Sequence, residues 1–268
     1  MGRPAYRSRV SATVPAPAAR ARRVAPDDEP RRLRFLREIF DATASHYDRI
    51  DALLSFGSGR RYRADALRRG GLAAGMQALD VAIGTGAVSV PASAIVGPLG
   101  RVVGVDPSAG MLRQARAALA IPLLQGMAEA LPFRARSFDF LSMGYALRHV
   151  SDLDVTFREY ARVLRPGGKL LLLEFRRPET RLGLALSRLY MGRVVPGISR
   201  LLTWSRPAEI LMKFCWQTVE DSLPPAEIVA TLARNGFTAV RHQACFGFLI
   251  EYHATRGPAS PGPKKTSG

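Results

Sequence analysis

The sequence has little lysine, little cysteine and no long uninterrupted apolar run, and each scarcity excludes a class of protein. Only four of its 39 basic residues are lysine, so arginine carries most of the formal net charge of +17. Cys215 and Cys245 form no Cys-x-x-Cys pair, which excludes a disulfide framework and indicates a reducing compartment. No run of about 18 uncharged apolar residues occurs, so no segment is expected to span a bilayer.

Patterns for nucleic-acid binding and metal binding are also missing. There is no zinc-finger spacing, no RNA-recognition aromatic motif and no stripe of interleaved basic and aromatic residues. We therefore expect neither a nucleic-acid partner nor a metal, whereas the basic balance also suits an anionic membrane surface. The chain of 268 residues, 47% of them apolar, is long enough for one substantial core. Its oligomeric state stays open.

The two ends of the chain differ in composition from the middle. Residues 1–29 carry six arginines, four prolines and no acid before Asp27. This favours a disordered basic tail over an organellar transit peptide, because prolines interrupt the amphipathic helix that such peptides use. Residues 255–268 are rich in Gly, Pro, Ser and Lys and are also expected to be disordered. One domain over 30–254 remains.

Between the tails, strand patterns alternate with helix patterns, which is typical of a doubly wound, mostly parallel α/β sheet. A helical cap over 30–75 precedes the first strand, and an apolar, arginine-rich segment over 177–222 interrupts the alternation as an edge helix pair or a lid. Helices are expected at 31–45, 60–69, 87–96, 109–120, 153–164 and about 224–235, and seven strands at 77–82, 102–105, 121–125, 138–143, 170–175, 237–243 and 246–254.

The first expected strand carries an acid and breaks into a Gly-Thr-Gly turn, in the stretch Leu79-Asp80-Val81-Ala82-Ile83-Gly84-Thr85-Gly86. Glycines let the backbone approach a ligand, and the following helix N-terminus adds a positive partial charge that suits a carboxylate. The third glycine of a dinucleotide fingerprint is replaced by Ser89. The loop therefore suits a nucleoside ligand without a pyrophosphate.

Three further segments are expected at the carboxyl ends of strands, where the ligands of open α/β sheets bind. Asp106 lies 20 residues after Gly86 (106 minus 86) and can accept hydrogen bonds from both hydroxyls of a ribose. Residues 126–129 follow the third strand and can contact an adenine edge through the backbone. Residues 144–149 follow the fourth strand and are expected over the reacting end of the ligand.

These segments contain motifs that occur together in a known family: Asp80-Val81-Ala82-x-Gly84-Thr85-Gly86, Val105-Asp106-Pro107-Ser108, Ala128-Glu129-x-Leu131-Pro132-Phe133 and Arg162-Val163-Leu164-Arg165-Pro166-Gly167-Gly168. Together they resemble the class I S-adenosylmethionine-dependent methyltransferases, which implies the Rossmann-like fold of that class. Two more motifs narrow the resemblance to the ubiquinone/menaquinone biosynthesis C-methyltransferases: Phe40-Asp41-x-x-Ala44-x-x-Tyr47-Asp48 and Leu147-Arg148-His149-Val150-Ser151-Asp152.

The resemblance implies S-adenosyl-L-methionine as cofactor. Met127 departs from the family, which usually places Asp or Asn there for the adenine amine, so it keeps only a backbone or packing role. The implied cofactor-binding residues are Asp80, Gly84, Thr85, Gly86, Asp106, Met127, Ala128 and Gly144.

The resemblance also implies substrate-side residues. The family's Tyr-Asp pair corresponds to Tyr47 and Asp48, and its Arg-Asn pair to Arg148 and His149, with His in place of Asn. As a hypothesis, Arg148 stabilises a phenolate, while Tyr47, Asp48 or His149 relays the proton, directly or through a water.

The reaction implied by the family is C-methylation of a prenylated benzoquinol or naphthoquinol in ubiquinone or menaquinone biosynthesis. Because such a quinol is embedded in the membrane, we expect a cytoplasmic protein that contacts an anionic membrane surface peripherally through 177–222. Two alternatives stay open: N- or O-methylation of a phospholipid or small apolar molecule, and a non-catalytic membrane-docked scaffold with the same fold.

Overall fold

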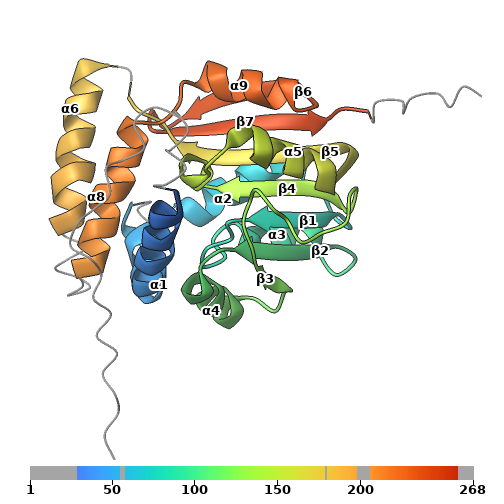
Figure 1. The fold of residues 1–268 in the computed structure, drawn as a ribbon, viewed down its shortest axis with the longest axis horizontal. Helices are drawn as coiled ribbons and strands as arrows, with labels where there is room; N and C mark the ends of the chain where they lie inside the picture. Colours follow the sequence, from blue (N-terminus) through green and yellow to red (C-terminus); the bar gives the residue numbers. More distant parts are fainter. Residues whose placement is uncertain (1–28, 55–57, 179, 198–205, 259–268) are drawn as a thin grey trace, which may run out of the picture.

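The computed structural model describes residues 29–54, 58–178, 180–197 and 206–258, so the expected N-terminal tail and most of the C-terminal one lie outside the described residues. One sheet has the strand order β3-β2-β1-β4-β5-β7-β6 (Figure 1). Six strands run in the same direction and β7 alone runs in the opposite direction. This confirms the mostly parallel, seven-stranded α/β sheet. The strands are β1 (Gln77–Val81), β2 (Arg101–Asp106), β3 (Leu123–Gln125), β4 (Phe138–Gly144), β5 (Leu164–Phe175), β6 (Phe237–Cys245) and β7 (Leu249–Arg256).

Helices occur where the sequence predicts them, and α1 is longer than expected. It runs from Glu29 to Leu54 instead of 31–45, because no proline or glycine interrupts the chain between Pro30 and Gly57. The other helices are α2 (Gly59–Arg69), α3 (Ser89–Val96), α4 (Ala109–Ala118), α5 (Leu153–Val163), α6 (Arg181–Leu189), α8 (Arg206–Glu220) and α9 (Pro225–Arg234), with a 3₁₀ turn at Leu147–His149 and a π turn at Tyr190–Val194.

Two boundaries differ from the prediction. Strand β5 begins at Leu164 and not at residue 170, and residues 165–168 form a bulge inside it, because Leu164 already pairs with Phe138 before Lys169 pairs with Phe140. At the other end, β7 continues to Arg256, and the Gly257 N–H donates to the Gly236 carbonyl at 2.9 Å. The ordered domain therefore extends past residue 254, where the C-terminal tail was expected to begin.

Helices pack on both faces of the sheet and at its carboxyl end. Tyr160 of α5 and Leu232 of α9 are buried on one face, and Leu67 of α2 is buried on the other. A third cluster joins α1 to α8, where the Phe35 and Phe214 rings meet edge to face at 5.4 Å. As Figure 1 shows, α1, α8 and α6 lie side by side at one end of the sheet, so the helices α6 and α8 of the 177–222 segment border the ligand-binding end.

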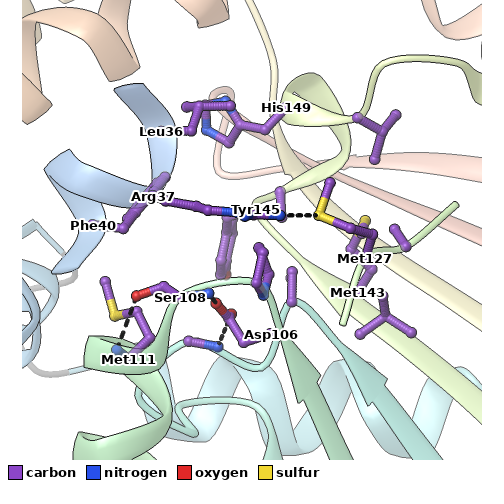
Figure 2. A pocket seen from close by; sticks show the side chains of 18 of the residues that line it. Leu36, Arg37, Phe40, Asp106, Ser108, Met111, Met127, Met143, Tyr145 and His149 are labelled. Atoms are coloured by element: carbon purple, nitrogen blue, oxygen red, sulfur yellow. Dashed lines mark hydrogen bonds between the residues drawn. The ribbon is translucent and has the colours of Figure 1, made fainter. Parts of the chain in front are cut away.

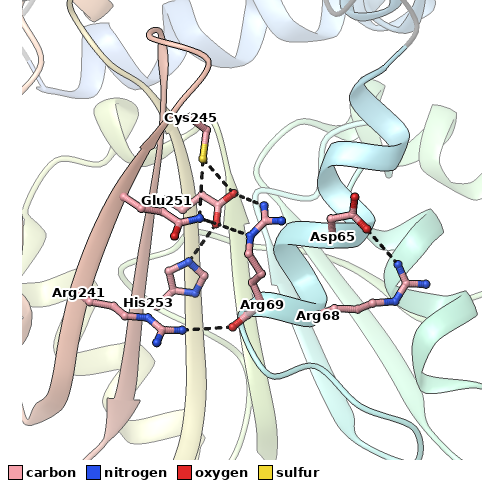
Figure 3. A network of polar contacts seen from close by, with 8 residues as sticks. Asp65, Arg68, Arg69, Arg241, Cys245, Glu251 and His253 are labelled. Atoms are coloured by element: carbon pink, nitrogen blue, oxygen red, sulfur yellow. Dashed lines mark hydrogen bonds and ion pairs between the residues drawn. The ribbon is translucent and has the colours of Figure 1, made fainter.

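A buried carboxylate joins α2 to the edge of the sheet (Figure 3). Glu251 of β7 is fully buried and accepts hydrogen bonds from Arg69 at 2.6 Å and from Gln243 at 3.0 Å. His253 Nε2 lies 3.0 Å from the same carboxylate. Burial alone would raise the pKa of Glu251, but the hydrogen bonds from His253 and Arg69 outweigh it and lower the pKa to about 2.

Glu251→Gln tests this contribution. At pH 7 we expect the free energy of unfolding to fall by about 2 kcal/mol, because charged hydrogen bonds of a buried group are lost. The lowered pKa makes the carboxylate's contribution complete above its ordinary value of 4.5, and it is lost as the pH falls toward 2. Urea unfolding should therefore separate the variant from the wild type at pH 7 and bring the two closer at pH 3. Asp65→Asn, at an exposed pair with Arg68, should change stability by less than about 0.5 kcal/mol. An equal effect of both substitutions would contradict the assignment.

Candidate active site

A cavity opens at the carboxyl ends of the parallel strands, beneath α1 (Figure 2). Residues from α1 and from the loops that follow β1, β2, β3 and β4 line it. The space between these walls, including the open mouth, is about 850 Å³, which is a usual size for a small-molecule site. The four segments that the sequence predicts to converge therefore do so.

Asp106 places an oriented carboxylate in the cavity wall. Its Oδ2 accepts the Gly84 N–H at 2.9 Å, and its Oδ1 accepts the Ser108 N–H at 2.8 Å. Because each oxygen can accept a second hydrogen bond, the carboxylate is still able to bind two ribose hydroxyls. Burial raises the pKa of Asp106 to about 6 against the effect of these two hydrogen bonds, so the group is ionised at pH 7.

Gly86 and Gly144 leave no room for a side chain, whereas a Cβ on Gly84 would meet no atom within 4 Å. A Cβ on Gly86 would lie 2.6 Å from Leu119 Cδ1, at a residue whose φ is +98°. A Cβ on Gly144 would lie 2.8 Å from Val88 Cγ2. Gly84 also has a positive φ, and its N–H is the one that orients Asp106. Gly84 and Gly144 therefore line the cavity with backbone, whereas Gly86 is not a lining residue and its contact with a cofactor stays a prediction.

Ser89, which replaces the third glycine of a dinucleotide motif, has a specific partner. Its hydroxyl donates to Asp80 Oδ2 at 2.7 Å, and the Ser142 hydroxyl donates to Oδ1 at 2.8 Å. Burial raises the pKa of Asp80 to about 6 despite these bonds. Asp80 and Thr85 are buried and lie outside the cavity lining, so their direct contact with a cofactor stays a prediction.

The wall after β3 consists of two apolar residues and the acid Glu129. Met127 and Ala128 both line the cavity, as predicted. The Met127 sulfur also lies 3.6 Å from Nη2 of Arg37, which reaches it from α1. Arg37 is a lining residue that the sequence did not single out, because its place depends on how α1 docks.

Asp41 docks α1 on the sheet. Its Oδ1 accepts the Ser108 hydroxyl at 2.6 Å and the Gly110 N–H at 2.7 Å. The Ser108 hydroxyl in turn accepts the Met111 N–H at 3.0 Å, which caps α4. The carboxylate thus binds the first turn of α4, where the helix dipole favours an anion. The sequence shows Asp41 only as part of a motif and gives no sign of this partner.

His149 lines the cavity with a neutral ring. The ring stacks on Phe214 at 5.7 Å and meets Phe40 edge to face at 5.8 Å. Both ring nitrogens are buried, and neither has a hydrogen-bond partner among the described residues. Burial first, and then the charges of Arg148 and Arg32, hold the pKa of His149 well below its ordinary value. The ring is therefore neutral at pH 7, and its unprotonated nitrogen is a hydrogen-bond acceptor.

The other predicted substrate-side residues are not all in the wall. Tyr47 lines the cavity, and its ring lies 6.4 Å from that of Phe40. Asp48 is exposed and is not a lining residue. The structure thus brings Tyr47 and His149 to one cavity and leaves Asp48 outside it.

Arg148 lies behind the cavity wall, with a side chain that is only 6% exposed. Its Nη1 donates to Glu174 and to the Tyr145 carbonyl, both at 2.5 Å, and its Nε donates to Thr218 of α8 at 3.0 Å. Tyr145 has a φ of +60°, a conformation that costs about 1–3 kcal/mol. These contacts give Arg148 a positioning role for Tyr145, and its stabilisation of a phenolate stays a prediction.

Asp106 is oriented to accept ribose hydroxyls, the Gly84 backbone allows a close approach, and Met127 and Ala128 offer apolar contacts for the ring of a base. S-adenosylmethionine presents such groups and fits, and the sheet order is that of the class I methyltransferases. The protein is an S-adenosylmethionine-dependent methyltransferase. Within that class, the chain belongs to the ubiE/COQ5 methyltransferase family, whose family model matches residues 28–256.

Two bacterial relatives align with most of this chain. The demethylmenaquinone methyltransferase of Lactococcus lactis is 35% identical over 226 residues, which cover 81% of this chain and 88% of the relative. A protein of Syntrophotalea carbinolica, named ubiquinone/menaquinone biosynthesis C-methyltransferase, is 36% identical over 223 residues, covering 81% and 92%.

Solved structures share the fold at low sequence identity. A possible histamine N-methyltransferase of Thermotoga maritima has a TM-score of 0.59 and 20% identity, over 82% of this chain and 99% of that one. Phosphoethanolamine N-methyltransferase 2 of Haemonchus contortus, solved with S-adenosylmethionine, has a TM-score of 0.60 and 16% identity, over 83% and 60%. At this identity the likeness concerns the fold alone.

The Arg148–Glu174 pair generates a prediction about stability. Arg148→Ala should lower the free energy of unfolding by about 3–5 kcal/mol, because it leaves a buried carboxylate without its partner. Replacing both residues by Met should recover most of that loss. Urea unfolding of the single and double variants measures the coupling, and additive losses would contradict it. Arg165→Ala, at a half-exposed pair with Asp139, is the control and should cost less than about 1 kcal/mol.

Proposed function

We propose that this enzyme methylates a ring carbon of a prenylated benzoquinol or naphthoquinol. The observation that carries the proposal is His149, a neutral base in the wall of a largely apolar cavity, with both nitrogens buried and without a partner among the described residues. A quinol presents an apolar ring and a hydroxyl that can use such a partner. The names of the relatives in Lactococcus and Syntrophotalea describe this substrate class for those proteins.

In the proposed reaction, His149 accepts the proton of the quinol hydroxyl. Loss of that proton makes the neighbouring ring carbon nucleophilic, and the carbon forms its new bond to the methyl group as the sulfur–methyl bond breaks. The methylated carbon then loses its own hydrogen as a proton and the oxygen regains one, which restores the aromatic quinol, so one proton is released for each methyl group transferred. S-adenosylmethionine supplies the electrophilic methyl group. We assign the outward relay of the proton to Tyr47, which lines the same cavity. Holding the two reactants in line can supply about 7–11 kcal/mol of the barrier reduction. The packing of α1 and α8 around the quinol ring would therefore lower the barrier by at least as much as the base does.

Quinone profiling tests the substrate. In cells that lack this gene, mass spectrometry of lipid extracts should show a quinone that is lighter by one methyl group, and the full-length gene should restore the methylated form. Incubation of the purified enzyme with methyl-labelled cofactor should place the label on ring carbon. Label on nitrogen or oxygen would instead support the alternative acceptors, a phospholipid amine or a small-molecule hydroxyl.

The role of His149 is tested by His149→Phe, which keeps a flat ring against Phe214 and removes both nitrogens. We expect kcat to fall at least about 100-fold, the usual contribution of a general base. The dissociation constant for S-adenosylhomocysteine, measured by calorimetry, should change less than about twofold. His242→Phe, at an exposed histidine of the edge strand β6, is the matched control and should keep full activity. Full activity in His149→Phe would remove it from the mechanism.

We also propose that the enzyme docks on an anionic membrane surface to reach its prenylated acceptor. Among the described residues, none of the helices has the length and apolarity to cross a bilayer. Large apolar side chains are nevertheless exposed at the ligand-binding end: Leu182, Leu186 and Leu189 of α6 are 71%, 58% and 51% exposed, and Phe246 and Phe248 of the β6–β7 turn are 73% and 45% exposed. We call these five residues the apolar end.

Strand register and arginine content support docking through the apolar end. Leu249 pairs with Phe175, the last residue of β5, and the Arg176 N–H donates to the Phe248 carbonyl at 2.8 Å, so the β6–β7 turn lies where the lid segment begins. Residues 180–197 contain three arginines and no acid, and one of the three, Arg188, pairs with Glu220 of α8. Each arginine near an anionic surface contributes roughly 1 kcal/mol, and leucines spaced along one helix insert into the interface.

Vesicle co-sedimentation tests the docking. Leu182→Ser with Leu186→Ser should reduce binding to vesicles of phosphatidylglycerol and phosphatidylcholine by about tenfold or more, since two apolar side chains no longer enter the interface. Binding of the wild type should also weaken with salt. The control is Leu99→Ser, because Leu99 is 87% exposed and lies in the turn before β2. This turn is at the amino end of β2, away from the ligand-binding end of the sheet. Equal binding of all three proteins would contradict the surface.

A further inference from the structure

We propose that Arg37 is a cofactor-binding residue that holds the adenine ring of S-adenosylmethionine together with Met127. The inference rests on the cofactor assignment above. It adds to that assignment a contact from α1, a helix that none of the predicted cofactor-binding residues belongs to.

The strand order places Arg37 at the base end of the cofactor. Asp106 ends β2 and binds the ribose, whereas Gly144 ends β4, on the far side of β1. The base therefore lies on the β3 side, where Met127 follows the strand. Arg37 Nη2 is 3.6 Å from Met127 Sδ, so its guanidinium lies at the base end and away from the amino-acid end.

The chemistry of the two side chains favours the flat faces of a purine. A thioether is a weak acceptor and a guanidinium only donates, so neither can bind the 6-amino group strongly. A thioether does pack well against an aromatic ring, and a planar guanidinium stacks on one. We therefore infer that Arg37 and Met127 contact the ring faces, in place of the acidic or amide side chain that binds the amine elsewhere in the family.

Arg37 is available for this contact. It is an exposed residue that lines the cavity, and Figure 2 shows its side chain extending from α1 across the cavity toward Met127. It forms no ion pair with any residue that the structure describes. Arg34, three residues earlier on the same helix, is exposed but does not line the cavity, which makes it a matched control.

The test compares two ligands in calorimetry with the full-length protein. S-adenosylhomocysteine has both the base and the amino-acid end, and 5′-methylthioadenosine has only the base end. Arg37→Ala should weaken both ligands by the same factor, about 3- to 5-fold, as expected for a cation–π contact of an exposed side chain. Arg37→Lys should recover little of the loss, because the planar group is absent. Arg34→Ala should change both affinities less than twofold, and thermal unfolding should show that all variants fold.

Three results would overturn the inference. Unchanged affinity for both ligands in Arg37→Ala would remove the contact. Weakening of S-adenosylhomocysteine alone would place Arg37 at the amino-acid end. If the wild type itself bound neither ligand, the placement of the cofactor would fail as well, and this outcome is distinct from the first two.

Discussion

The bond between Asp41 and the first turn of α4 is the interaction on which the cavity depends. It fixes α1 across the carboxyl ends of the strands, at a distance of 67 residues along the chain from Ser108. Gly110 permits the approach, because a Cβ there would lie 2.8 Å from the Asp41 Cα. In this position α1 forms one wall of the cavity and also packs against α8.

The docked α1 also supports the substrate side of the cavity, through its contacts with α8 and with the loop after β4. Arg32 of α1 donates to the His149 carbonyl at 3.0 Å, while Phe214 of α8 packs on the His149 ring. Arg148 connects that loop to Glu174 of β5 and Thr218 of α8. The cofactor side and the substrate side therefore share supports, and neither wall is built from one segment alone.

The sequence was sufficient for features that arise within one strand–loop–helix unit. Asp106 and Gly84 could be placed because a parallel sheet brings the ends of β1 and β2 together whatever lies elsewhere. Arg148 could not be placed, since its partners come from β5 and α8, and a motif does not tell a buried arginine from one that faces a ligand. Arg37 and Asp41 were missed as individual site residues for a related reason: helical periodicity identifies the buried face of α1 but not the surface on which it docks.

The two buried acids beside the site, Asp80 and Asp106, have a consequence for turnover. Burial raises the pKa of each to about 6, and each lies in the field of another acid, so both carboxylates are mostly ionised at neutral pH and add a negative potential to this part of the site. The methyl donor carries a positive sulfonium, whereas the demethylated product is a neutral thioether. The potential therefore binds the donor more strongly than the spent product, and part of the attraction disappears with each methyl transfer, which favours exchange of the product for a fresh donor.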